Sequence, residues 1–211
     1  MKNRLIKVGA AVPSMKVGDV SYNTGEIISL MNAAKDCGLV VFPELCISGY
    51  TCADLFDQEA LIAASEEGLR QIAKASEKRK GTTYVVGIPV KYGNCLYNCA
   101  AIVSEGVISG IVPKTNIPAY SEFYELRWFA SGKDVIGRTL TIAGQEVPFG
   151  IDLLAEDKAS ASVLGIDICE DLWVPDRPST HACLAGANLL TIAIQQFLIH
   201  WRRIRVALQV T

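Results

Sequence analysis

The feature of this sequence that most constrains its fold is a series of short apolar runs that each stop at a chemically reactive residue. Residues 163–168 are predicted to form a buried strand, which stops at Cys169. A thiol at the point where a strand turns into a loop is fixed by the strand and left open to a substrate by the loop. A lone cysteine after an apolar run is more often a small buried hydrophobic residue, so a catalytic interpretation needs other groups.

Composition limits the class of protein. The chain has 211 residues, half of them hydrophobic, and a net charge of −2, which suits one substantial α/β domain. No basic stripe crosses the first 190 residues, so nucleic acid is not expected as the main partner. The N-terminal apolar run is short and contains Pro13, so neither a signal peptide nor a membrane span is expected. A cytoplasmic location without a membrane partner is therefore predicted.

The cysteines argue against a metal site and against a disulfide framework. There are seven of them, an odd number, and none forms a CxxC pair. Reduced thiols in a cytosolic protein fit this pattern better.

The order of predicted elements favours a mixed sheet, or a pair of sheets, with helices outside. Helical spacing predicts helices, whereas short apolar or alternating runs predict strands. The long segment 115–132 is aromatic and irregular, which is typical of a functional loop. Strands are expected at 6–12, 39–42, 83–90, 95–104, 107–112, 139–142, 146–149, 163–168 and 188–194, and helices at 20–37, 57–80 and 178–187.

Three predicted strand ends carry reactive groups, namely Glu44, Lys114 and Cys169. A thiol has a pKa near ~8.5, so a catalytic cysteine needs a base or a positive field. A Cys169–His181 pair is one arrangement. A Glu–Lys–Cys set is the better one, because the glutamate accepts the thiol proton and the lysine stabilises an oxyanion. Sequence spacing also allows Glu44 and Lys114 to be ordinary surface charges.

Three segments, 42–50, 113–118 and 169–173, resemble the signature regions of the nitrilase superfamily of carbon-nitrogen hydrolases. The last of them, together with 123–129, is most similar to the N-terminal glutaminase domain of glutamine-dependent NAD synthetases. The resemblance implies an α-β-β-α sandwich, here C-terminally incomplete. Sheets of this fold commonly pair across a dimer interface, so a homo-oligomer is expected.

The resemblance also implies catalytic roles. Cys169 would be the nucleophile that forms a thioester with the side-chain amide carbon of glutamine and releases ammonia. Glu44 would be the general base, and Lys114 would hold the oxyanion with the backbone N–H of Glu170. Glu125 matches the second glutamate of the family, which orients the lysine and the substrate.

The glutamine pocket and the cofactor requirement follow from the same resemblance. No metal or organic cofactor is implied for the amidase step. ATP and deamido-NAD would be used only by a synthetase half, and the sequence holds no GxxxxGK[ST] phosphate loop. For Tyr120 and Phe123, simple loop packing is an equal alternative. Residues that match the pocket lining are Tyr50, Tyr120, Phe123 and Glu170.

Residues 1–190 are predicted to form the carbon-nitrogen hydrolase domain, and residues 191–211 a divergent basic tail. The resemblance stops sharply near residue 191, which suggests a shifted reading frame that the coding DNA would reveal. Two other functions stay open. One is a stand-alone amidase, nitrilase or carbamoylase for another small substrate. The other is a catalytically silent fragment.

Overall fold

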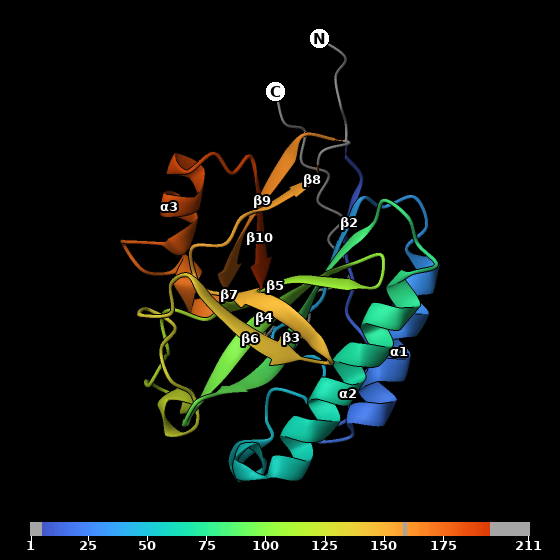
Figure 1. Cartoon of the computed structure of the whole chain (residues 1–211). Coiled ribbons are helices and arrows are strands. Elements are labelled where there is room, and N and C mark those ends of the chain that lie inside the picture. The colour runs from blue at the N-terminus through green and yellow to red at the C-terminus, as the bar shows by residue number, and fades with distance from the viewer. Residues whose placement is uncertain (1–5, 158–159, 195–211) are drawn as a thin grey trace.

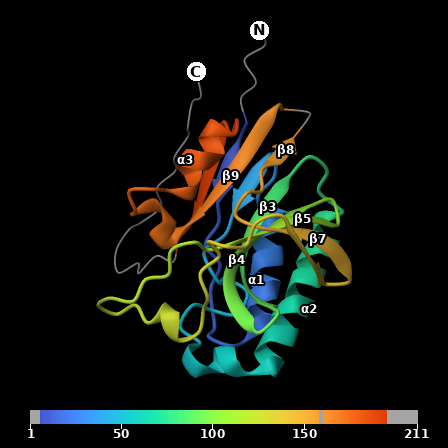
Figure 2. The ribbon, with the colours of Figure 1, turned by 60° about the vertical axis from the view of Figure 1, so that its left-hand side comes forward.

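The computed structural model describes residues 6–157 and 160–194, and in this part of the chain the elements form four layers (Figure 1). Helices α1 (Val20–Ala33) and α2 (Glu59–Ser76) cover one face of a large sheet. A smaller sheet packs on the other face, and helix α3 (Pro178–Leu184) lies outside it (Figure 2). The layer order is therefore α-β-β-α, as the resemblance to the nitrilase superfamily implies.

The large sheet is mixed. Its strands are β1 (Val8–Ala10), β2 (Leu39–Val41), β3 (Thr83–Tyr92), β4 (Cys95–Ser104), β5 (Val107–Pro113), β6 (Arg138–Ile142) and β7 (Gln145–Phe149). Their order is β1-β2-β3-β4-β5-β7-β6. Strands β1, β2 and β3 run parallel, whereas β3, β4 and β5 form consecutive antiparallel hairpins. Strands β2 and β5 therefore run in the same direction, and their C-terminal ends lie at the same end of the sheet.

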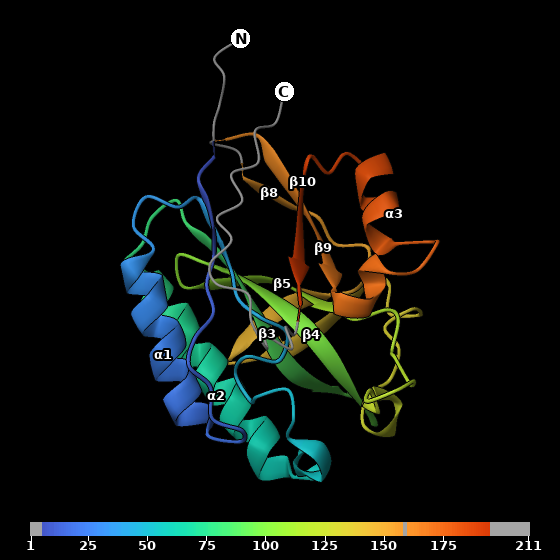
Figure 3. The same cartoon turned by 180° about the vertical axis from the view of Figure 1, so that it is seen from behind.

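The small sheet contains β8 (Ala155–Asp157), β9 (Ser162–Ile168) and β10 (Leu189–Ala193), in the order β10-β9-β8. Strands β9 and β10 run parallel and are connected through α3 (Figure 3). Strand β8 was not predicted, because its three residues include two acids and show no apolar pattern. It forms through antiparallel pairing with β9.

The helices are shorter than predicted. Helix α1 begins where the Asp19 side chain accepts a hydrogen bond from the backbone of Tyr22, and it ends at Ala33. Asp36 then has a φ of 64°, which a continuing helix does not allow. The predicted helix 57–80 is replaced by a 3-10 turn, η1 (Ala53–Asp57), and by α2.

Successive side chains of the large sheet point to opposite faces, so they belong to two separate hydrophobic cores. Val86 of β3 belongs to the core under the helices, together with Ile27 and Leu69, while its neighbour Val85 faces the small sheet. Burial on both faces explains why these strands read as continuous apolar runs. The core between the sheets consists of Leu39, Val85, Ala100, Ile102, Val112, Leu164, Ile166, Ile168 and Cys169.

Within the described ranges, no helix combines the length and the apolar character that crossing a bilayer requires. The predicted strand 188–194 corresponds to β10. Most of the predicted basic tail, residues 195–211, lies outside the described residues, and the reading-frame hypothesis stays a prediction.

The two long helices touch at Gly68, which generates a stability prediction. An added Cβ there would lie 2.6 Å from the Thr24 hydroxyl and 3.2 Å from a Val20 methyl group. We expect Gly68→Ala to lower the free energy of unfolding by about 1–3 kcal/mol through overpacking.

The matched control is Gly25→Ala on the exposed face of α1, where an added Cβ meets nothing within 4 Å. This change should stabilise the helix by about 0.5–1 kcal/mol. Urea unfolding of both variants measures the difference. Equal effects of the two substitutions would contradict the close helix contact.

Candidate active site

Strand ends deliver the three predicted reactive residues to one end of the sandwich. Glu44 follows β2, Lys114 follows β5 directly, and Cys169 follows β9 of the facing sheet. Glu44 and Lys114 are 1% and 0% exposed. The alternative that they are ordinary surface charges is therefore wrong.

A glycine makes room for the turn that buries Glu44. A Cβ on Gly87 of β3 would lie only 2.2 Å from the backbone nitrogen of Leu45. The Gly87 carbonyl accepts a hydrogen bond from the backbone N–H of Ile47 at 3.2 Å. Leu45 itself has a φ of 51°, so the chain turns sharply just after the glutamate. The turn rests directly on the backbone of β3.

The centre of the site is a buried cluster of one ammonium and two carboxylates. The Nζ of Lys114 lies 2.7 Å from the Oε1 of Glu44. It lies 2.7 and 2.9 Å from the two oxygens of Glu125, which begins the 3-10 turn η2 (Glu125–Arg127). Charge-assisted bonds of this length are strong where water is excluded.

Two further side chains hold the carboxylates. The Asn98 amide donates to Glu44 at 2.7 Å and to Glu125 at 3.2 Å. The Tyr50 hydroxyl donates to Glu125 at 2.7 Å. Sequence reasoning placed Tyr50 in the pocket lining, whereas the structure joins it to the charged cluster. The sequence analysis did not identify Asn98 as a site residue. The signal that could have revealed it is an asparagine within a largely apolar strand.

Burial sets the protonation behaviour of these groups. It raises the pKa of the Glu44 carboxyl, and the charge of Lys114 offsets this only in part. Burial acts to lower the pKa of Lys114, but the two carboxylates outweigh it, so the pKa lies above its ordinary value. Burial, the charge of Glu125 and its hydrogen bond to the phenol, and the charge of Glu44 raise the pKa of Tyr50, which therefore stays a donor.

Cys169 lies in a strained turn at the end of β9. Its φ is 49°, in the left-handed region that residues with a Cβ seldom occupy. It begins the 3-10 turn η3 (Cys169–Leu172) and is 9% exposed. Strain of this kind is concentrated at functional sites, because surrounding structure must hold it in place.

A third buried acid, Asp171, connects this turn to the strand end that carries Lys114. Its Oδ1 accepts hydrogen bonds from the backbone and side-chain nitrogens of Asn116 at 2.7 and 2.9 Å. Its Oδ2 accepts from the backbone nitrogens of Thr115 and Ile168, at 3.3 and 3.2 Å. Burial raises the pKa of Asp171, and these bonds counteract the rise. Asp171 thus joins the two sheets at the site, a role that sequence reasoning missed.

The remaining predicted pocket residues lie together beside the cysteine turn. The Tyr120 hydroxyl donates to the Oε2 of Glu170 at 2.8 Å. The rings of Tyr120 and Phe123 meet edge to face, with centroids 5.7 Å apart. Tyr120 is half exposed, so loop packing does not bury it. The arrangement leaves an aromatic edge and a carboxylate open at the rim of the site.

The histidine alternative gains no support from the structure. His181 lies on α3, where its exposed ring pairs with Asp176 at 2.7 Å. Among the described residues, no group of three or more His, Cys, Asp or Glu side chains could hold a metal ion. That the amidase step needs no cofactor stays a prediction.

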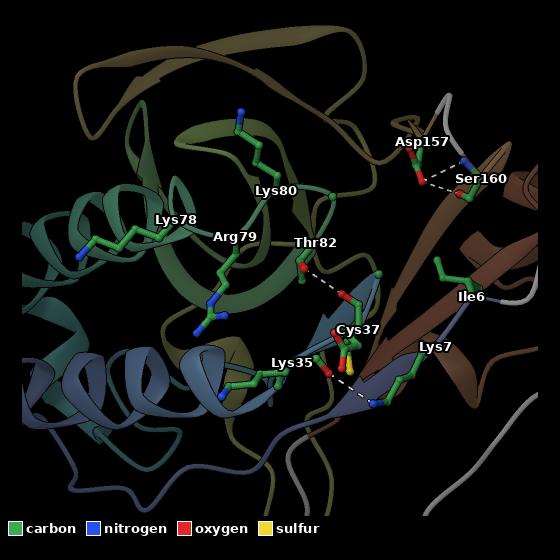
Figure 4. Close-up of a pocket in the computed structure, with 14 residues that line it drawn as sticks. Ile6, Lys7, Lys35, Cys37, Lys78, Arg79, Lys80, Thr82, Asp157 and Ser160 are labelled. Carbon is green, nitrogen blue, oxygen red and sulfur yellow. Dashed lines mark hydrogen bonds between the residues drawn. The ribbon is translucent and has the colours of Figure 1, made fainter.

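A hollow of about 880 Å³ lies at the opposite end of the strands, beside the start of β2 and β3 (Figure 4). It is rich in cationic side chains, but these do not converge: Lys78 and Lys80 point in different directions (Figure 4). Lys7 donates to the carbonyl of Lys35, and Arg79 to that of Asn32, near the C-terminus of α1. These cations suit the negative end of a helix dipole and take no part in the buried cluster.

Comparison with known proteins defines the class. The family model described as carbon-nitrogen hydrolase matches residues 7–206. The chain therefore belongs to the carbon-nitrogen hydrolase family, a family of enzymes, and this confirms the superfamily inferred from the three motifs.

The curated relatives that match this chain share one name within this class. The chain is 38% identical over 188 residues to a glutamine-dependent NAD(+) synthetase of Mycobacterium bovis. It is 39% identical over 191 residues to that of Mycobacterium leprae. Each match covers 88% of this chain and 27% of the relative. The chain thus spans about a quarter of the length of these relatives.

Solved structures confirm the fold. The crystal structure of a glutamine-dependent NAD(+) synthetase from Cytophaga hutchinsonii matches 91% of this chain and 31% of its own, with a TM-score of 0.76 and 26% identity. A nitrilase-superfamily amidase from Nesterenkonia sp. AN1 has a TM-score of 0.72 at 15% identity, over 92% of this chain and 66% of its own. The predicted nitrilase-like sandwich is therefore confirmed.

The bridge at Asp171 yields a second prediction. Both of its oxygens face N–H donors, so Asp171→Asn must place an amide NH₂ against donors in either orientation. We expect a loss of about 2 kcal/mol in the free energy of unfolding. Urea unfolding measures it, with the exposed Asp176→Asn as control. Equal stability of the two variants would show that the bridge is dispensable.

Proposed function

We propose that this chain hydrolyses the side-chain amide of glutamine to glutamate and ammonia through a thioester on Cys169. The observation that carries the proposal is the buried cluster of Glu44, Lys114 and Glu125. It lies at the end of the sandwich where strand β9 of the facing sheet ends at Cys169. An ammonium held between two carboxylates, near a thiol in a strained turn, supplies the groups that acyl transfer requires.

In the first half of the reaction the Cys169 sulfur attacks the amide carbon. Glu44 accepts the thiol proton, and the carbon–sulfur bond forms as the carbonyl oxygen becomes an oxyanion. Lys114 donates a hydrogen bond to this oxygen, helped by the backbone N–H of Glu170. Glu44 then returns the proton to the nitrogen, the carbon–nitrogen bond breaks, and ammonia leaves.

In the second half of the reaction, water replaces the Cys169 thiol as the nucleophile. Glu44 takes a proton from water, and the resulting hydroxide attacks the thioester carbon. Lys114 stabilises the second oxyanion. The carbon–sulfur bond breaks, the sulfur regains its proton, and the product acid leaves. Glu125 fixes the Lys114 ammonium during both halves through its two oxygens.

Two observations favour glutamine over an amide that carries no ammonium group. The Glu170 carboxylate lies at the rim beside Tyr120 and suits an α-ammonium group. The curated relatives are named glutamine-dependent NAD(+) synthetases. On this basis the ammonia would serve NAD synthesis from the deamido precursor, and ATP would be used only by a synthetase domain.

Ammonia release from glutamine tests the proposal directly. We expect Cys169→Ala to abolish release, and Lys114→Ala to lower the rate at least a hundredfold, about 3 kcal/mol of oxyanion stabilisation. Size-exclusion traces and circular dichroism of each variant control for folding. Glutamine hydrolysis by Cys169→Ala at the parent rate would refute the assignment. A parent chain that acts only on other amides or nitriles in a substrate panel would point to a stand-alone amidase.

The buried glutamate also predicts a pH dependence. Glu44 must be ionised to accept a proton, and its pKa is raised above 4.5. The rate should therefore fall as the pH drops through this raised pKa. The folded chain binds this proton more tightly than the unfolded chain does, so protonation of Glu44 does not itself destabilise the fold. Activity should return when the pH is restored. Irreversible loss that coincides with unfolding would contradict this prediction.

A further inference from the structure

Asn98 is a fully buried amide in the middle of β4. Its neighbours along the strand, Cys99, Ala100 and Ala101, are apolar and equally buried. A polar side chain in such a place needs hydrogen-bond partners. The partners of Asn98 are the two carboxylates of the charged cluster, Glu44 at 2.7 Å and Glu125 at 3.2 Å.

The orientation of this amide is set by its surroundings. Its Nδ2 donates to a carboxylate on either side, whereas its Oδ1 has no hydrogen-bond partner among the described residues. The reversed orientation would place Oδ1 against both carboxylates and repel them. An unpaired buried oxygen is unfavourable for stability. In the observed orientation the unpaired oxygen lowers stability, but both N–H donors of the amide bond the glutamates.

The charges explain what these donors achieve. Glu44 and Glu125 share the single ammonium of Lys114, so the cluster has one negative charge in excess when both glutamates are ionised. The negative charge of Glu125 acts to raise the pKa of Glu44, since two carboxylates that share one ammonium repel each other. A protonated Glu44 could not act as a base. A neutral donor that bonds both carboxylates favours the ionised form of each without adding a second cation.

We propose that Asn98 is a positioning residue that keeps Glu44 ionised and directs it toward the Cys169 thiol. The inference rests on the proposed function, since it assigns Glu44 the role of base. It adds a side chain that lies outside the three motif segments and acts through the carboxylates to which it donates.

The backbone and the side chain of Asn98 can be tested separately. The Asn98 carbonyl accepts the backbone N–H of Lys114 at 2.7 Å, and every substitution retains this bond. Asn98→Leu keeps the branched shape and the number of heavy atoms of the side chain and removes both donors, whereas Asn98→Ala also creates a cavity. A packing role would be rescued by leucine, and a hydrogen-bonding role would not.

The measurement is the rate at which iodoacetamide alkylates Cys169 as a function of pH, followed by mass spectrometry of the peptide that contains it. Alkylation needs the thiolate, and it requires no turnover of glutamine. The acid limb of the parent should report the coupled ionisation of the Cys169 thiol and Glu44, which acts as its base. For both Asn98 variants we expect this limb to move up by about one pH unit, the effect of losing a hydrogen bond to a charged group.

The matched control is Ser76→Ala, which removes another buried hydrogen-bonding group. The Ser76 hydroxyl donates to the carbonyl of Ala73 and accepts the backbone N–H of Gly106, in the turn between β4 and β5 far from Lys114. Its alkylation profile should match that of the parent even if its stability falls.

The result that overturns the inference is an Asn98→Leu profile that overlays the parent profile, or an equal shift in Ser76→Ala. Steady-state kinetics on glutamine add a second readout, in which kcat at neutral pH falls while KM stays near the parent value. If the parent releases no ammonia from glutamine, the proposed function fails, and the alkylation profile still decides the role of Asn98.

Discussion

The structure depends on one interaction, the burial of the Lys114 ammonium between the carboxylates of Glu44 and Glu125. Moving a lysine out of water is unfavourable unless opposite charges and hydrogen bonds surround it. Here the Nζ contacts three carboxylate oxygens within 2.9 Å. Removal of either glutamate would leave the buried Lys114 charge partly unpaired. The three segments that carry Glu44, Lys114 and Glu125 are far apart in the chain, and each is stable in its observed place only when all three meet.

The sandwich brings these segments together by simple means. Parallel pairing of β2 with β3 places Glu44 at one edge, where the small Gly87 lets the chain turn inward. The β4–β5 hairpin places Lys114 beside Asn98. Asp171 then ties the facing sheet to this edge through three hydrogen bonds from Thr115 and Asn116, and it accepts a fourth from Ile168 within its own sheet. The geometry of the site is therefore a consequence of strand register and of two buried polar side chains.

The sequence predicts the part of this arrangement that local pattern encodes. Apolar runs that stop at reactive residues identified Glu44, Lys114 and Cys169 as strand-end residues, and three motifs identified the family. The roles of Asn98 and Asp171 arise from contacts between segments far apart in the chain, and local pattern does not contain them. Strand β8 was missed for the same reason, since only its pairing with β9 makes it a strand.

The particular chemistry remains the central claim, and a trapped intermediate tests it most directly. The chain would be mixed with glutamine at neutral pH, quenched in acid within its first turnovers, digested and examined by mass spectrometry. The account predicts a glutamyl thioester on Cys169 and on none of the other six cysteines. Ammonia release without any acyl adduct on Cys169, or with the adduct on another cysteine, would contradict it.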